Sequence, residues 1–128
     1  MKIIQTKKAP QAIGPYSQAL HVGTEDLIFT SGQLGLCPDS GEFISDSTDA
    51  QCRQALFNIQ AILEKSGLTL KNVVKMTVFL TDIDDFQSVN QIFTEVLLDH
   101  KPARSVVQVA ALPKKARVEI EAIAAIPS

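Results

Sequence analysis

Arg104 is the residue whose type and position most directly suggest chemistry. It lies in the segment 101–105, KPARS, and begins a mostly apolar run that is typical of a strand. Its planar guanidinium can hold a carboxylate through two parallel hydrogen bonds. From its position alone, Arg104 is either such an anchor or a surface-paired arginine at a strand end. The second is the commoner case, because arginine is mostly exposed in proteins.

Glu119 and Glu121 are a second candidate, a pair of acids in the segment 118–122, VEIEA. Side chains alternate between the two faces of a strand, so both carboxylates share one face and the apolar residues take the other. Two acids about 7 Å apart can ionise at different pH and supply a general acid and a general base. The alternative is a solvated outer face, which we expect for at least one of the two.

Tyr16 follows Gly14 and Pro15 in a turn-forming segment. A tyrosine on a rigid loop can line a pocket, although turn tyrosines commonly serve packing. The two cysteines suggest no chemistry of their own. Cys52 lies on the apolar stripe of a predicted helix, as a core residue does, and Cys37 lies in a loop where nothing nearby in sequence would lower its thiol pKa.

The common signatures of metal, phosphate and serine-hydrolase sites are missing from the sequence. Two histidines and two cysteines are scattered, with no local spacing that would bring them onto one metal ion. The segment 31–35, SGQLG, lacks the lysine and the glycine spacing of a phosphate-binding loop. No Gly-x-Ser-x-Gly motif is present. The residues alone therefore predict a small α+β domain with an anionic-ligand site.

Alternating apolar residues and turn signals predict the strands that position these side chains. Residues 17–22 and 27–31 are expected to be short strands, and the first 45 residues are expected to form an antiparallel meander. Residues 72–81 predict a strand with both faces largely covered. Two further strands are expected over residues 105–111 and 117–124.

Helical periodicity predicts two helices. The first has an apolar stripe over residues 52–63, a cap at Ser47 or Thr48, and an end near Gly67. The second has Asp84 or Asp85 near its positive end and an apolar stripe formed by Phe86, Val89, Phe93, Val96 and Leu97. The order of elements predicts an α+β fold, with one mixed sheet and both helices packed on one face.

Length and composition limit the classes of function. The 128 residues, 45% of them hydrophobic, suit a single domain over residues 1–128. A net charge of −2 removes the broad cationic surface that nucleic acids require, so we expect RNA binding to be weak. No apolar run approaches the roughly 20 residues of a membrane span. We expect a cytoplasmic protein, because the N-terminus lacks a secretory signal and two cysteines make a poor disulfide framework.

Four segments, taken in order, resemble the RidA/YjgF family of enamine and imine deaminases. The resemblance implies a chorismate-mutase-like α+β domain, a homotrimer with three sites in the clefts between subunits, and no metal or organic cofactor. The implied activity is hydrolysis of reactive imines from pyridoxal-phosphate dehydratases, such as 2-iminobutanoate and 2-iminopropanoate, to 2-keto acids and ammonia. The segments are residues 12–16 (AIGPY), 30–33 (TSGQ), 102–105 (PARS) and 118–124 (VEIEAIA).

The resemblance also implies roles for particular residues. Arg104 matches the arginine that anchors the substrate carboxylate, and Glu119 matches the acid that holds or activates the attacking water. The other residues carried over to the substrate-binding site are Tyr16, Ser31, Gly32 and Asn90.

Val106 marks a departure from the family pattern. Many members have a cysteine two positions after the arginine, so a thiol is expected to be dispensable in this chain. The backbone N–H of Val106 remains available to bind the carboxylate.

Two alternatives from other functional classes stay open at this point. One is a translation-inhibiting endoribonuclease, an activity attached to some relatives, although the chain lacks a basic stripe interleaved with aromatic residues. The other is a non-catalytic regulator or holdase that binds 2-keto acids or unfolded chains, because a carboxylate anchor serves binding and catalysis alike.

Overall fold

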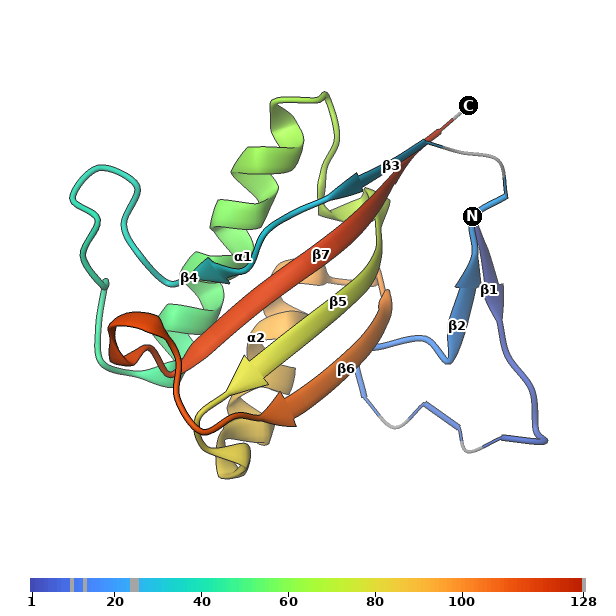
Figure 1. The fold of residues 1–128 in the computed structure, drawn as a ribbon. Helices are drawn as coiled ribbons and strands as arrows, with labels where there is room; N and C mark the ends of the chain where they lie inside the picture. The colour runs from blue at the N-terminus through green and yellow to red at the C-terminus, as the bar shows by residue number, and fades with distance from the viewer. Residues whose placement is uncertain (10, 13, 24–25, 128) are drawn as a thin grey trace.

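Strand β7 (Val118–Ile126) lies at the centre of the main sheet (Figure 1). The structure is a computed structural model and describes residues 1–9, 11–12, 14–23 and 26–127. On one side β7 pairs antiparallel with β3 (Asp26–Phe29) and β4 (Gln33–Leu34). On the other side it pairs antiparallel with β5 (Val73–Leu80), which pairs in parallel with the edge strand β6 (Ala103–Gln108). The predicted mixed sheet is confirmed.

Helices α1 (Thr48–Glu64) and α2 (Phe86–Leu97) both cover one face of this sheet (Figure 1). The Ser47 hydroxyl caps α1 by accepting a hydrogen bond from the N–H of Ala50 at 3.2 Å. Beyond the end of α1, Gly67 has a φ of +77°, a conformation that favours glycine. Asp85 is the N-cap of α2, and its carboxylate accepts a hydrogen bond from the Thr48 hydroxyl at 2.7 Å. This contact joins the starts of the two helices, both of which the sequence predicted.

The core lies between the helices and the sheet. Alternation in β5 and β7 directs every second side chain toward the helices, where these residues are buried. The helices contribute the apolar stripes expected from their periodicity. Side chains from both layers with no exposed surface include Leu56, Ile59, Val89, Phe93, Met76, Val78 and Ile120.

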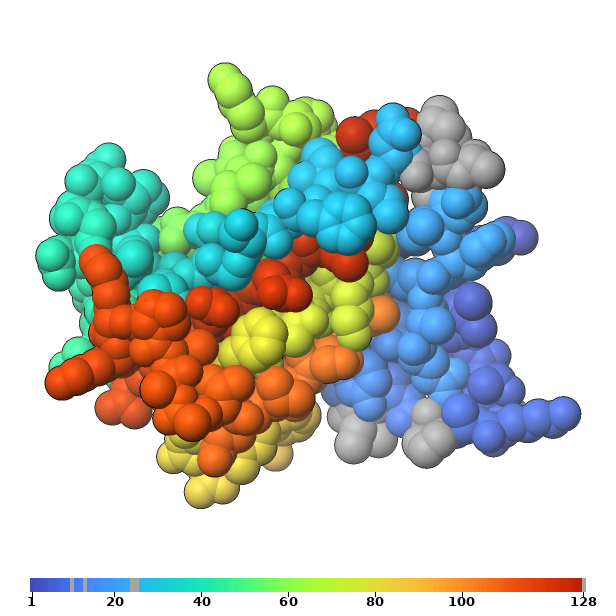
Figure 2. Space-filling model, viewed as in Figure 1, coloured from blue at the N-terminus to red at the C-terminus, as the bar shows by residue number. Residues whose placement is uncertain are grey.

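The opposite face of the sheet has no helix over it, and its side chains reach the surface in Figure 2. Phe29 is 67% exposed there and Val107 is 43% exposed. Register places Phe79 of β5 beside Glu119 of β7 and Val107 of β6, all on this outer face. The expectation that both faces of β5 are largely covered therefore holds only for the helix side, because Lys75, Thr77 and Phe79 are each only half-buried.

The first 45 residues do not form the expected meander. Strands β1 (Lys2–Ile4) and β2 (Ala19–His21) make a separate antiparallel pair, whereas β3 and β4 join the main sheet through β7. That part of the prediction was wrong because pairing follows long-range register, which short apolar runs do not encode. The sequence places a turn at residues 23–26, between the two expected strands, and Thr24 and Glu25 of this turn lie outside the described residues.

Other bounds differ from prediction by a few residues. Strand β6 begins two residues before the expected range and ends three earlier, so Arg104 lies within the strand and not ahead of it. Strand β7 extends two residues further than expected. Three short 3₁₀ turns complete the described structure: η1 (Leu70–Asn72), η2 (Ile83–Asp85) and η3 (Pro113–Lys115). None of the described helices is long and apolar enough to cross a bilayer.

Candidate active site

Arg104 lies among aromatic rings on the helix side of β6. Its Cζ atom is 4.9 Å from the ring centroid of Phe93, 5.5 Å from that of Tyr16 and 5.7 Å from that of Phe86. A guanidinium at these distances is attracted to the faces of the rings. Its Nη2 atom donates a hydrogen bond to Oδ1 of Asn90 at 2.7 Å. The arginine is thus held on several sides by uncharged groups.

The other amino group of Arg104 has no partner. Its Nη1 atom is buried and makes no hydrogen bond within the described structure. Burial lowers the pKa of the Arg104 guanidinium below its usual value, but an arginine stays charged at neutral pH. A buried cation with an unsatisfied donor is costly unless an anion or a polar ligand completes it. The surface ion pair considered as the alternative for Arg104 is not observed in the described part of the chain.

The loop that carries Tyr16 is tied to the start of β6. The N–H of Ser17 donates to the carbonyl of Pro102 at 3.0 Å, and the Ser17 hydroxyl donates to the carbonyl of Lys101. These two bonds bring Tyr16 to Arg104 although the residues are far apart in sequence. The predicted residues Tyr16, Asn90 and Arg104 therefore form one cluster, the arginine cluster.

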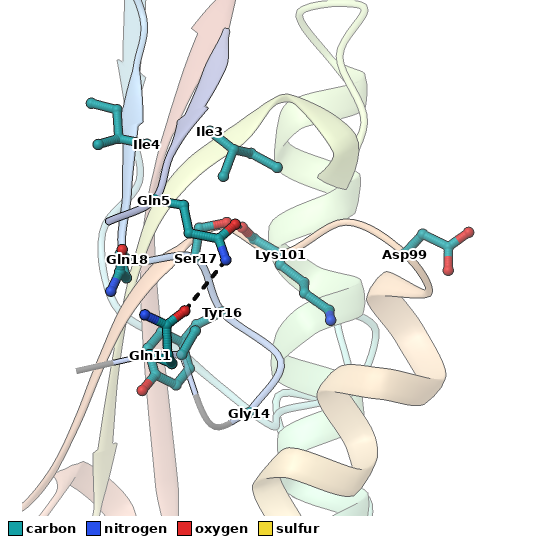
Figure 3. Close-up of a pocket in the computed structure, with 11 residues that line it drawn as sticks. Ile3, Ile4, Gln5, Gln11, Gly14, Tyr16, Ser17, Gln18, Asp99 and Lys101 are labelled. Atoms are coloured by element: carbon teal, nitrogen blue, oxygen red, sulfur yellow. Dashed lines mark hydrogen bonds between the residues drawn. The ribbon is translucent and has the colours of Figure 1, made fainter. Parts of the chain in front are cut away.

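A cavity of about 240 Å³ opens beside Tyr16 (Figure 3). Amide side chains of Gln5 and Gln11, joined by a hydrogen bond of 3.4 Å, line it together with Lys101. Tyr16 belongs to both the cavity and the arginine cluster, whereas Arg104 itself is not among the residues that line the cavity.

Glu119 lies in a different place, on the outer face of β7. Thr30 joins this segment to β7 through two hydrogen bonds with Ala122, at 2.9 and 3.0 Å, and Ser31 and Gly32 follow it in the chain. A Cβ atom at Gly32 would come within 2.7 Å of Cδ and Oε2 of Glu119. Glycine is therefore the residue that lets the carboxyl group lie against this loop. Ser31, Gly32 and Glu119 form the second cluster, the glutamate cluster.

The two clusters lie on opposite faces of the sheet. Arg104 pairs with Met76, whose side chain is buried on the helix side. Glu119 pairs with Phe79, three residues further along β5 and so on the other face. The predicted site residues thus divide into two groups, and one chain does not bring them together.

Two contacts of Arg104 were not expected from the sequence, those with Phe86 and Phe93. Both had been assigned only to the apolar stripe of α2. Their spacing from Asn90, four residues before and three after, was a signal that the three residues share a helix face. Val106, two residues beyond Arg104, directs its side chain toward the core.

The two cysteines differ in thiol pKa. Hydrogen bonds from the backbone of Ser40 and Asp39 lower the pKa of Cys37, so the expectation that nothing nearby would lower it was wrong. Burial raises the pKa of Cys52 to about 12, as suits a core residue. Among the described residues, no three His, Cys, Asp or Glu side chains are grouped so that they could hold a metal ion.

The fold and the clusters define a small α+β protein in which an arginine is held among aromatic rings and an amide. The family model described as Endoribonuclease L-PSP matches residues 6–126. The human protein named 2-iminobutanoate/2-iminopropanoate deaminase is 49% identical over 123 residues, 96% of this chain and 88% of the human one. The bovine protein of the same name is 52% identical with the same coverage.

Solved structures agree with these sequence comparisons. The crystal structure of Escherichia coli TdcF with bound serine has a TM-score of 0.76 and 44% identity, covering 99% of this chain and all of that one. RidA from the Antarctic bacterium Psychrobacter has a TM-score of 0.76 and 48% identity, covering 98% of this chain and all of that one. The chain belongs to the RidA/YjgF family, whose family model carries the description Endoribonuclease L-PSP.

Proposed function

We propose that the protein is an imine deaminase that hydrolyses 2-imino acids, such as 2-iminobutanoate and 2-iminopropanoate, to 2-keto acids and ammonia. The names of relatives about half identical to the chain support this activity. The observation that carries the proposal is the unpartnered, buried Nη1 atom of Arg104. A 2-imino acid supplies what this atom lacks, because it carries a carboxylate next to the carbon that reacts.

In this mechanism Arg104 binds the substrate carboxylate and fixes the position of the neighbouring C2 atom. Asn90 holds the guanidinium by accepting from Nη2, and Nη1, which has no hydrogen-bond partner among the described residues, donates to the substrate carboxylate. Two charge-assisted hydrogen bonds in parallel orient the ligand as well as bind it. Fixing C2 in place makes the later attack by water effectively intramolecular.

Water then adds to C2 of the protonated imine while Glu119 accepts a proton from it. The product of this step is a tetrahedral carbinolamine. The proton held by Glu119 then passes to the nitrogen. As the C2–N bond breaks and ammonia leaves, the carbinolamine hydroxyl gives its proton to the Glu119 carboxylate and becomes the carbonyl of the 2-keto acid. Glu119 finally passes this proton to ammonia or solvent. The residues account for the reaction with one carboxylate anchor and one general base.

The position of the two clusters supports sites built from two subunits. Because Arg104 and Glu119 lie on opposite faces of the sheet, a neighbouring copy has to bring its glutamate cluster to the arginine cluster. Contacts between two different surfaces of identical chains form a ring when the rotation between neighbouring copies closes. A homotrimer is the ring implied by the family, and its interface would cover the exposed Phe29 and Val107 of the outer face.

The proposed activity is tested by generating 2-iminobutanoate in place and following 2-oxobutanoate and ammonia. Arg104→Lys keeps the charge but loses the planar fork, so we expect kcat/KM to fall roughly a hundredfold or more. Glu119→Gln should lower kcat while binding of 2-oxobutanoate persists. Glu121→Gln is the matched control, since it removes an exposed acid from the same face of the same strand.

The outcomes distinguish catalysis from simple binding. If the parent protein binds 2-oxobutanoate but does not accelerate imine hydrolysis, the chain is a keto-acid-binding regulator and the proposal is wrong. If Arg104→Lys retains parental activity, the assignment of the site is wrong.

A further inference from the structure

Helix α2 presents three residues to Arg104 in one line. Phe86, Asn90 and Phe93 are spaced by four and three residues, so they share one face of the helix. The two rings lie 5.7 and 4.9 Å from Cζ of Arg104, and the Asn90 amide between them accepts its hydrogen bond. The guanidinium therefore faces a ring, an amide and a second ring in succession.

The two rings differ in what else they do. Phe93 has no exposed surface and belongs to the core, so its loss would affect folding. Phe86 is only half-buried and lies in the first turn of α2, where the core depends on it less. Phe86 is therefore the ring that can be substituted to test its contact with Arg104 while the protein still folds.

Two hydrogen bonds fix the position of Phe86. Asp85, immediately before it, is held by the hydroxyl of Thr48 at 2.7 Å. The N–H of Ile83 in the preceding turn donates to Oε1 of Gln108 at 2.8 Å. Gln108 lies on the same strand and the same face as Arg104, four residues along. The strand that carries the arginine therefore also holds the turn that precedes Phe86.

We infer that Phe86 is a positioning residue that holds the Arg104 guanidinium in place for the substrate carboxylate. Its ring attracts the cation and keeps water from one side of it, while Asn90 fixes the guanidinium plane. The inference rests on the proposed function for its kinetic consequence, but the contact between ring and guanidinium is independent of that function.

The contact is tested first in the unliganded parent protein by NMR. Nuclear Overhauser effects are expected between the ring protons of Phe86 and the side-chain protons of Arg104. The Arg104 Nε–Hε signal should shift in Phe86→Leu and stay near its parental position in Phe86→Tyr, which keeps the ring. No such effects in the folded parent would overturn the inference without touching the proposed activity.

Kinetics then test the positioning role. Phe86→Leu should raise KM for 2-iminobutanoate and the inhibition constant of 2-oxobutanoate about tenfold, with kcat within about twofold, because the arginine binds substrate and transition state alike. Phe86→Tyr should restore both constants. Phe57→Leu is the matched control, an exposed phenylalanine on α1.

A double-mutant cycle shows whether Phe86 acts through Arg104. In an Arg104→Lys background, Phe86→Leu should have little further effect, because the planar guanidinium that it positions is absent. Equal losses in both backgrounds, or a Phe86→Tyr variant as impaired as Phe86→Leu, would contradict the inference. Failure of the parent to hydrolyse imines would count against the proposed function alone, since the NMR test stands apart from turnover.

Discussion

Subunit complementation gives the sharpest prediction from the separation of Arg104 and Glu119. Neither Arg104→Lys nor Glu119→Gln should have substantial activity alone. When the two variants are mixed and their subunits exchanged, some sites should combine an intact arginine from one chain with an intact glutamate from its neighbour. Activity should therefore return only in mixed oligomers.

The expected recovery follows from counting. In a ring of randomly mixed chains in equal amounts, each neighbour contributes its intact residue with a chance of one half. About one quarter of the sites are then complete, so roughly a quarter of parental activity should return. Each variant alone is expected at about one hundredth of parental activity, so the recovery is easily measured above background.

The assay is release of 2-oxobutanoate after co-refolding two differently tagged variants, with mixed oligomers verified by native mass spectrometry. Mixing Arg104→Lys with the double variant Arg104→Lys/Glu119→Gln should give no recovery. If verified mixed oligomers of the two single variants stay inactive, both residues act within one chain or not at all. The assignment of opposite faces to one shared site would then be refuted.

Three other predictions concern residues outside this pair. Gly32→Ala would place a Cβ atom 2.7 Å from the Glu119 carboxyl and so displace this group. A displacement of about 1 Å should lower kcat roughly a hundredfold. Circular dichroism should show that the variant remains folded. Lys115 has a φ of +59°, a left-handed conformation that is costly for a residue with a side chain. Lys115→Gly should therefore raise the free energy of unfolding by about 0.5–1 kcal/mol and Tm by a few degrees. An unchanged or lower Tm would contradict this prediction. Iodoacetamide near pH 8 should alkylate Cys37 and spare Cys52, because the pKa of Cys37 is lowered and that of Cys52 is raised to about 12; mass spectrometry of the native protein would identify the modified residue.

The helices were predictable because their signals are local. Ser47 lies at the start of α1 and Gly67 just beyond its end, in positions that these residue types favour. The apolar residues between them follow the helical period throughout. The pairing of the N-terminal strands was not predictable in this way. Ile28 pairs with Ala124, almost a hundred residues away, and an alternating run of apolar residues says which side chains share a face but not which strand lies beside it.

The sequence proposed the candidate residues but could not predict that they lie in two clusters on opposite faces of the sheet. Alternation within the strand assigned a face to Glu119, whereas Arg104 was expected at the start of its strand and was assigned no face. Their relative faces depend on the register of β5, where Arg104 pairs with Met76 and Glu119 with Phe79. No local pattern in the sequence specifies that register, because it depends on how the whole chain folds. The aromatic contacts of Arg104 could not be predicted either, because phenylalanines on the apolar stripe of a helix suggest only core packing.

The separation of the two clusters has a physical consequence for the charge of Arg104. If Arg104 and Glu119 lay on one face within reach of each other, they would form an ion pair, and the glutamate would satisfy the Nη1 atom that the substrate carboxylate is proposed to meet. That pair would also hold Glu119 ionised while engaging the oxygens that must accept a proton from water. Rings and an amide around the arginine instead leave it charged, partly desolvated and without an acidic partner among the described residues. In the proposed site, Glu119 of a second subunit approaches Arg104. The substrate and the attacking water can then lie between the guanidinium and the carboxylate.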